Sequence, residues 1–183
     1  YPPANWGVPT TLAEPVHDVV VIGGGMCGLV TGFALIGAGI RNIRIFDRSE
    51  PGLEGPWLTY ARMETLRSPK QLTGPAYGMA SLTFRAWYVA QFGNDAWSAL
   101  DKIPRPMWME YLRWYRKVLE LPVENNVEVT AIRPEGALMR LMTSGKGARE
   151  TSVLARKVVM ATGRDGMGHP SIPDFVNGLP ETY

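Results

Sequence analysis

The stretch from Asp18 to Leu29, DVVVIGGGMCGL, constrains the fold of this chain more than any other part of it. An apolar, β-branched run leads into glycines at positions 23, 25 and 28, in the spacing G-x-G-x-x-G, and an apolar segment follows. This pattern is typical of a buried strand that turns sharply into a helix. The first N–H groups of a helix have no partner within it and lie at the positive end of its dipole. The stretch therefore predicts a phosphate-binding turn between a strand and a helix.

The residues that follow extend this turn into a strand–helix–strand unit. The helix is apolar almost all round, as expected for one that packs on a parallel sheet, and it should end at Gly39. Ile43–Asp47 then has the β-branched composition of a second strand. The sequence thus predicts a right-handed βαβ unit.

The glycine spacing and the acid at the end of the second strand together predict a dinucleotide site. Gly23 permits the tight turn, Gly25 removes a side chain that would collide with a pyrophosphate, and Gly28 lets the helix approach the first strand. Asp47, about 20 residues beyond the last glycine, stands where a carboxylate accepts ribose hydroxyls. Two simpler interpretations stay open, a capping role for Asp47 and a solvent-facing salt bridge for its neighbour Arg48.

Composition narrows the class of protein. The net charge is only +2, with no basic block, so a nucleic-acid partner is not expected, and no apolar run has the length of a membrane span. Cys27 is the single cysteine, and His17 and His169 lie far apart, which argues against disulfide and metal chemistry. We expect a cytoplasmic protein with an N-terminal extension over residues 1–17 and one domain over residues 18–183.

The middle of the chain predicts few regular elements. Residues 48–105 mix aromatic side chains with many prolines and glycines, which predicts a long irregular segment of functional importance. Pro106 should begin an amphipathic helix. Its apolar face contains Trp108, Tyr111, Leu112, Tyr115, Val118 and Leu119, and its basic face contains Arg113, Arg116 and Lys117.

The last part of the chain predicts strands. Val127–Ile132, Ala137–Thr143 and Glu150–Leu154 alternate as three short strands, and Lys157–Gly163 is a buried strand that ends in a glycine turn. The fold class is therefore α/β. We expect a Rossmann-like, three-layer domain with a parallel sheet and a small antiparallel β-meander.

This order of elements, ending in Ala161-Thr162-Gly163, resembles the FAD-binding domain of flavoproteins that bind two dinucleotides. Gly55-Pro56-Trp57 resembles the G-x-W of class B flavoprotein monooxygenases, the flavin-containing, Baeyer-Villiger and N-hydroxylating enzymes. Met63–Leu72 and Ile103–Tyr115 are similar to two segments of the N-hydroxylating branch, the second to its R-x-x-F-x-x-Y-x-x-W helix. The R-x-G-G of amine oxidases is missing, and one cysteine does not suffice for a disulfide reductase.

The resemblance implies which residues contact FAD. Backbone groups of the glycine turn would hold the pyrophosphate, Asp47 the ribose, Val129 would lie near the adenine, and Gly55–Trp57 would lie toward the flavin. The implied cofactor-binding residues are Gly23, Gly25, Met26, Cys27, Gly28, Asp47, Arg48, Gly55, Pro56, Trp57, Val129, Ala161, Thr162 and Gly163. Simpler roles stay open for two of them. Trp57 could anchor its loop on the core, and Cys27 could be a small packing residue. Lys70 is either a flavin-side residue or a solvated surface lysine.

The resemblance also implies an activity. NADPH would reduce FAD, and a C4a-hydroperoxyflavin would then transfer oxygen to a small molecule. No side chain stands out as catalytic. The NADPH domain and the C-terminal part of the FAD domain are not recognisable, so the domain is expected to be incomplete, an N-terminal fragment of its parent protein. The alternatives are a nicotinamide-only Rossmann dehydrogenase and a non-catalytic dinucleotide-binding module or fragment; the oligomeric state is left open.

Overall fold

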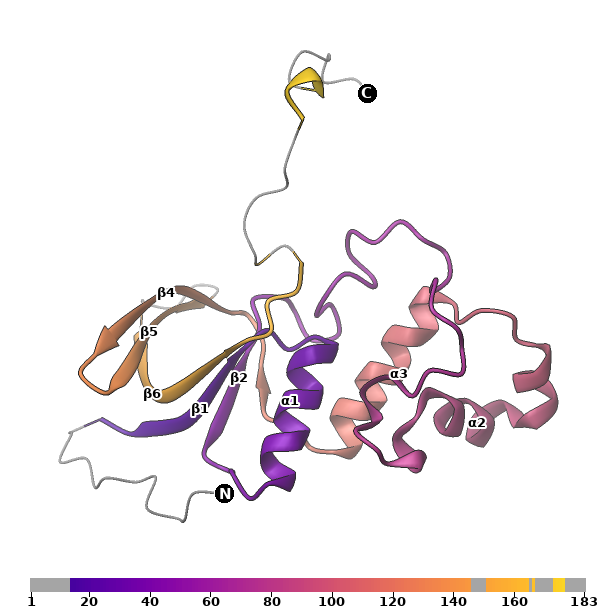
Figure 1. Ribbon diagram of the computed structural model, residues 1–183, viewed down its shortest axis with the longest axis horizontal. Helices are drawn as coiled ribbons and strands as arrows, with labels where there is room; N and C mark the ends of the chain where they lie inside the picture. Colours follow the sequence, from indigo (N-terminus) through magenta and orange to yellow (C-terminus); the bar gives the residue numbers. More distant parts are fainter. Residues whose placement is uncertain (1–13, 146–150, 165, 167–172, 177–183) are drawn as a thin grey trace.

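The computed structural model describes residues 14–145, 151–164, 166 and 173–176. Six strands form one mixed sheet in the order β3-β2-β1-β6-β5-β4 (Figure 1). Its parallel part contains β1 (Val16–Ile22), β2 (Ile43–Phe46), β3 (Val123–Glu124) and β6 (Thr151–Met160). Helix α1 (Met26–Gly37) joins β1 to β2, which confirms the predicted βαβ unit. β1 begins ahead of the predicted domain boundary at residue 18, and most of the predicted N-terminal extension lies outside the described residues.

The antiparallel part contains β4 (Val127–Glu135), β5 (Leu138–Gly145) and the first half of β6. The prediction of two separate strands over 150–163 is wrong, because β6 is continuous. Its residues 151–155 pair antiparallel with β5, and residues 154–160 pair parallel with β1. No glycine or proline separates the two segments, so nothing in the backbone interrupts the strand.

Alternate side chains of the parallel strands point into two different cores. Val19, Val21, Ile43 and Ile45 belong to the larger core, which they share with the helices. Val20 and Phe46 face the other side and pack with Leu141 and Ala155 of the meander. Figure 1 shows the resulting three layers, with the meander on one side of β1 and β2 and the helices on the other. This confirms the three-layer, Rossmann-like prediction.

The segment predicted to be irregular contains a helix, α2 (Phe84–Ala99), and two short 3₁₀ helices at Gly74–Ala76 and Ala80–Leu82. Gly93 (φ 84°) breaks the helical geometry within α2, which explains why the helical pattern is hard to see in the sequence. The next helix, α3 (Arg105–Val118), confirms the helix predicted from Pro106. Four residues of its predicted apolar face are buried, whereas Leu119 is half-buried and Val118 is 52% exposed at the end of the helix.

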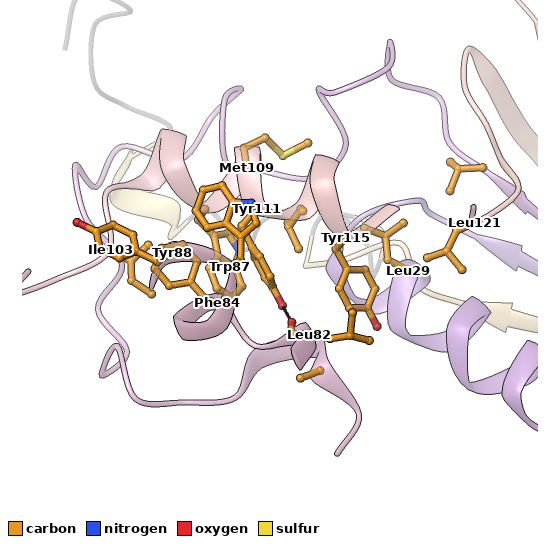
Figure 2. Packing of buried hydrophobic residues seen from close by; sticks show 14 of the residues in the cluster. Leu29, Leu82, Phe84, Trp87, Tyr88, Ile103, Met109, Tyr111, Tyr115 and Leu121 are labelled. Atoms are coloured by element: carbon orange, nitrogen blue, oxygen red, sulfur yellow. Dashed lines mark hydrogen bonds between the residues drawn. The ribbon is translucent and has the colours of Figure 1, made fainter. Parts of the chain in front are cut away.

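Aromatic side chains of α2 and α3 form the centre of the larger core (Figure 2). Tyr111 donates a hydrogen bond to the carbonyl of Leu82 (2.6 Å), and Tyr115 donates one to the carbonyl of Pro75 (2.8 Å). Burial raises the pKa of Tyr111 and raises the pKa of Tyr115 to about 12. These two bonds hold the 3₁₀ segments against α3. Over the residues described, none of the helices combines the length and the apolar composition that a membrane-spanning helix needs.

Candidate dinucleotide-binding site

The N-terminus of α1 has free hydrogen-bond donors. The first bond within the helix runs from the N–H of Leu29 to the carbonyl of Gly25 (2.9 Å), so the N–H groups of Met26, Cys27 and Gly28 have no partner inside it. No side chain of the described residues caps the helix, and its first turn contains no acid. These donors and the positive end of the helix dipole together form an anion-binding position.

Two of the three motif glycines are required by the fold itself. A Cβ on Gly23 (φ 108°) would lie 2.3 Å from the carbonyl oxygen of Ala161, and one on Gly28 would lie 1.8 Å from the carbonyl oxygen of Gly23. Gly23 therefore lets the turn pass the end of β6, and Gly28 lets α1 pack against the turn. Both structural roles agree with the prediction.

Gly25 is different, because neither its backbone conformation nor the described residues around it require a glycine there. Its φ of −71° and ψ of −171° suit any residue, and its nearest neighbour to an added Cβ is the Cα of Gly55, at 3.8 Å. Gly25 lines a cavity at the start of the helix, where a pyrophosphate would bind. The fold therefore does not account for this glycine, and a pyrophosphate contact for Gly25 stays a prediction.

Asp47 is buried beside the same turn. Its Oδ2 accepts a hydrogen bond from the N–H of Gly24 (2.7 Å), and its Oδ1 accepts one from the N–H of Ser49 (2.8 Å). The carboxylate thus ties the end of β2 to the glycine turn, which is the capping role left open by the sequence. Each carboxylate oxygen keeps acceptor capacity beyond these bonds. Its contact with a ribose stays a prediction.

The A-T-G turn and the G-x-W loop meet the glycine turn at the carboxyl ends of the parallel strands. The N–H of Ala161 donates to the carbonyl of Ile22 (2.8 Å), so the turn of Ala161, Thr162 and Gly163 begins next to Gly23. In the loop that starts at Gly55 and Pro56, Trp57 is half-buried and packs edge-on against Trp108, with ring centroids 6.0 Å apart. Trp57 therefore anchors its loop on the core, and a flavin contact for it stays a prediction.

A cavity of about 240 Å³ opens beside the glycine turn. One side is formed by Gly24, Gly25 and Leu29, and the other by the loop after β2 and by α3. That second side contributes Pro51, Gly52, Glu54, Met109, Leu112, Arg113 and Arg116. The sequence placed the two arginines on the basic face of α3 and assigned them no role in the site.

A buried network links the loop after β2 to α3 and β3. Glu54, 4% exposed, accepts from Arg116 (2.7 Å), from Asn125 (2.7 Å) and from the N–H of Gly52 (2.8 Å). Arg116 also donates to Asn125 (2.8 Å) and to the carbonyl of Val123 (2.6 Å). The sequence offers one signal for this network, an acid in a loop of otherwise small and apolar residues, but it gives no hint of the partners.

A second, polar hollow of about 280 Å³ lies where β2 ends and β4 begins. Arg48 lines it, and so do Asn126 and Glu128. Val129, the next residue of β4, packs with the smaller core, so only its backbone is available near this hollow. An adenine contact for Val129 and a cofactor contact for Arg48 stay predictions.

Two simple sequence interpretations are wrong. Lys70 is not a solvated surface lysine: its Nζ donates to the carbonyls of Trp97 (2.7 Å) and Leu100 at the end of α2 and lies 4.8 Å from the centre of the Trp97 ring. A flavin-side position for Lys70 stays a prediction. Cys27 is exposed and is not a packing residue, because it faces outward from the first turn of α1.

Comparison with known proteins agrees with this geometry. The sequence pattern of the family described as FAD-NAD(P)-binding matches residues 20–165. The chain belongs to the FAD-NAD(P)-binding family. Within the curated proteins, it is 47% identical over 166 residues to the FAD-dependent urate hydroxylase of Xanthomonas campestris pv. campestris. That match covers 90% of this chain but only 34% of the hydroxylase.

Two solved structures show the same fold. The reduced form of ornithine hydroxylase from Pseudomonas aeruginosa has a TM-score of 0.71 at 18% identity, over 92% of this chain and 43% of that one. A flavin-containing monooxygenase from Stenotrophomonas maltophilia has a TM-score of 0.60 at 27% identity, over 81% of this chain and 39% of that one. The first comparison supports the fold alone.

The residues present fit the FAD that this family binds. Free N–H groups at the start of α1, the cavity beside Gly25 and the carboxylate of Asp47 would suit a pyrophosphate followed by a ribose. The described residues contain no group of three or more His, Cys, Asp and Glu side chains that could hold a metal ion.

Proposed function

We propose that this chain is the FAD-binding part of an NAD(P)H-dependent flavoprotein monooxygenase that acts on a small molecule. The observation that carries the proposal is the cavity lined by Gly24 and Gly25 at the uncapped start of α1. When bound, FAD supplies the electron transfer and the oxygen activation. The residues of this chain bind and orient it. The NAD(P)H site and the substrate site would lie in parts of the protein beyond this chain, which spans about a third of the hydroxylase it matches.

Each part of the site then has a role. The N–H groups of Met26, Cys27 and Gly28 would donate to the pyrophosphate, and Asp47 would accept from the ribose next to it. The A-T-G turn and the loop of Gly55 and Trp57 would flank the flavin half. The hollow beside Arg48 and the start of β4 would receive the adenine.

Urate is the first substrate to test. The relative at 47% identity is named a urate hydroxylase, and hydroxylation is also the activity named for the ornithine enzyme of similar fold. We therefore propose oxygen transfer to a small, electron-rich molecule such as a purine. Ornithine is the second substrate to test, because it is an amine without a ring and so contrasts with urate.

The test uses the full-length protein. We expect it to purify with FAD, identified in the supernatant after denaturation, and to oxidise NADPH in air faster when urate is present. Mass spectrometry with ¹⁸O₂ should find one labelled oxygen in the product. A protein that neither contains nor takes up FAD would contradict the whole proposal. One that binds FAD but incorporates no oxygen into urate, ornithine or other small molecules would contradict the monooxygenase part.

A further inference from the structure

The guanidinium of Arg113 is held at the cavity wall opposite the glycine turn. Its Nη2 donates to the carbonyl of Gly52 (2.8 Å). A Cβ on Gly52 (φ 84°) would lie 2.5 Å from Nε of Arg113, so the glycine leaves the notch in which the guanidinium sits. Gly24 and Gly25 line the same cavity from the other side.

Within the described part of the chain, Arg113 has no partner carboxylate, in contrast to Arg116 on the same helix. Arg116 forms an ion pair with Glu54 (2.7 Å) and two further hydrogen bonds. Among the described residues no carboxylate forms an ion pair with Arg113, and its bond to Gly52 uses one of its five N–H donors. With two arginines, one glutamate and the positive end of α1, the cavity carries a net positive charge.

We propose that Arg113 binds a phosphate oxygen of the FAD pyrophosphate, from the side opposite the N-terminus of α1. This inference rests on the proposed function. A guanidinium offers phosphate a planar pair of N–H donors, which a helix N-terminus alone does not provide. The pyrophosphate would thus be held between backbone donors of the βαβ unit and one side chain of α3, whose position is fixed by the loop after β2.

The test compares Arg113→Met with Lys117→Met in the full-length apoprotein. Lys117 is an exposed cation on the same helix, so its loss controls for net charge. We expect Arg113→Met to weaken the binding of both FAD and ADP about tenfold or more, measured by calorimetry, because both ligands carry the pyrophosphate. Lys117→Met should bind within twofold of wild type. The dependence of log Kd on log salt concentration should be shallower for Arg113→Met alone.

Arg113→Lys gives a second measurement. It keeps the charge but not the planar pair of donors, so the affinity for FAD should fall between wild type and Arg113→Met. An equal affinity of Arg113→Met and Lys117→Met overturns the contact. So does a loss for FAD without a loss for ADP, since both ligands carry the pyrophosphate. A wild-type protein that binds neither ligand overturns the proposed function, and the contact with it.

Discussion

The two sides of the cavity are built in different ways. On one side, β1, the glycine turn, α1 and Asp47 are joined through backbone groups and close packing within a single βαβ unit. On the other side, the loop after β2 is held to α3 and β3 by charged and polar side chains, with Glu54 bonded to residues 62 and 71 positions away. The first side should therefore lose stability when a larger side chain replaces a glycine. The second should lose stability when a charged side chain is removed.

The largest effect is expected from adding one methyl group to the backbone-built side. In Gly28→Ala the Cβ would meet the carbonyl oxygen of Gly23 at 1.8 Å, so α1 must move away from the turn. We expect the free energy of unfolding to fall by about 3 kcal/mol. Gly37→Ala, in the same helix but with nothing within 4 Å of its Cβ, should be neutral or slightly stabilising. Urea unfolding measures both, and equal values for the pair would contradict the packing role of Gly28.

A smaller loss is expected on the side built from side chains. Glu54→Ala leaves Arg116, Asn125 and the N–H of Gly52 without their shared acceptor. Because Arg116 is partly exposed, the cost should be about 2 kcal/mol, less than for a fully buried ion pair. Glu110→Ala, an exposed acid on α3, should change stability by less than about 0.5 kcal/mol. If both variants unfold at the same urea concentration, the network does not hold the loop.

Lys70 separates a structural lysine from a cofactor contact. Lys70→Met removes a cation from the carbonyls at the end of α2, which should cost about 1 kcal/mol of unfolding free energy. The Kd for FAD should not change, because Lys70 is directed toward α2. Lys102→Met, at an exposed lysine two residues after Leu100, is the control for stability. If Lys70→Met binds FAD more weakly at unchanged stability, Lys70 contacts the cofactor and is not a structural lysine.

A further effect is expected only at alkaline pH, in the aromatic core. An unfolded tyrosine ionises near pH 10, while burial raises the pKa of Tyr115 to about 12. Between these values the unfolded chain releases its proton first, so the free energy of unfolding falls as the pH rises from about 10 to about 12. Tyr115→Phe should make this fall shallower, although it loses the bond to Pro75 near neutral pH. Urea unfolding at several pH values measures this. If the free energy of unfolding of Tyr115→Phe falls with pH as steeply as that of wild type, the raised pKa does not belong to Tyr115.

The backbone-built side is the part that sequence reasoning could predict. The turn at Gly23 and Gly28, the place of Asp47 and the A-T-G turn beside them all depend on neighbours along the chain or on the ends of parallel strands. These features leave a local pattern, so spacing and periodicity suffice. The same holds for α3, whose apolar residues recur at helical spacing.

The remaining features depend on contacts between distant segments, which no local pattern encodes. Arg113 and Arg116 look like any other basic helix face until Gly52 and Glu54 are brought next to them. Lys70 looked like a surface lysine because its partners are carbonyl groups, which every residue has. β6 is one continuous strand because β5 pairs with its first part and β1 with its second. The pattern of α2 is interrupted by Gly93.

The central claim is that a ligand, and not the fold, requires Gly25. Its most direct test is the Kd for FAD of one full-length variant, Gly25→Ala, with the unfolding free energy of the apoprotein as the control. We predict a stability within about 1 kcal/mol of wild type, because the backbone and the space around Gly25 accept alanine, with FAD binding at least about tenfold weaker. Wild-type affinity for FAD, or a loss of stability as large as that of Gly28→Ala, would contradict the account.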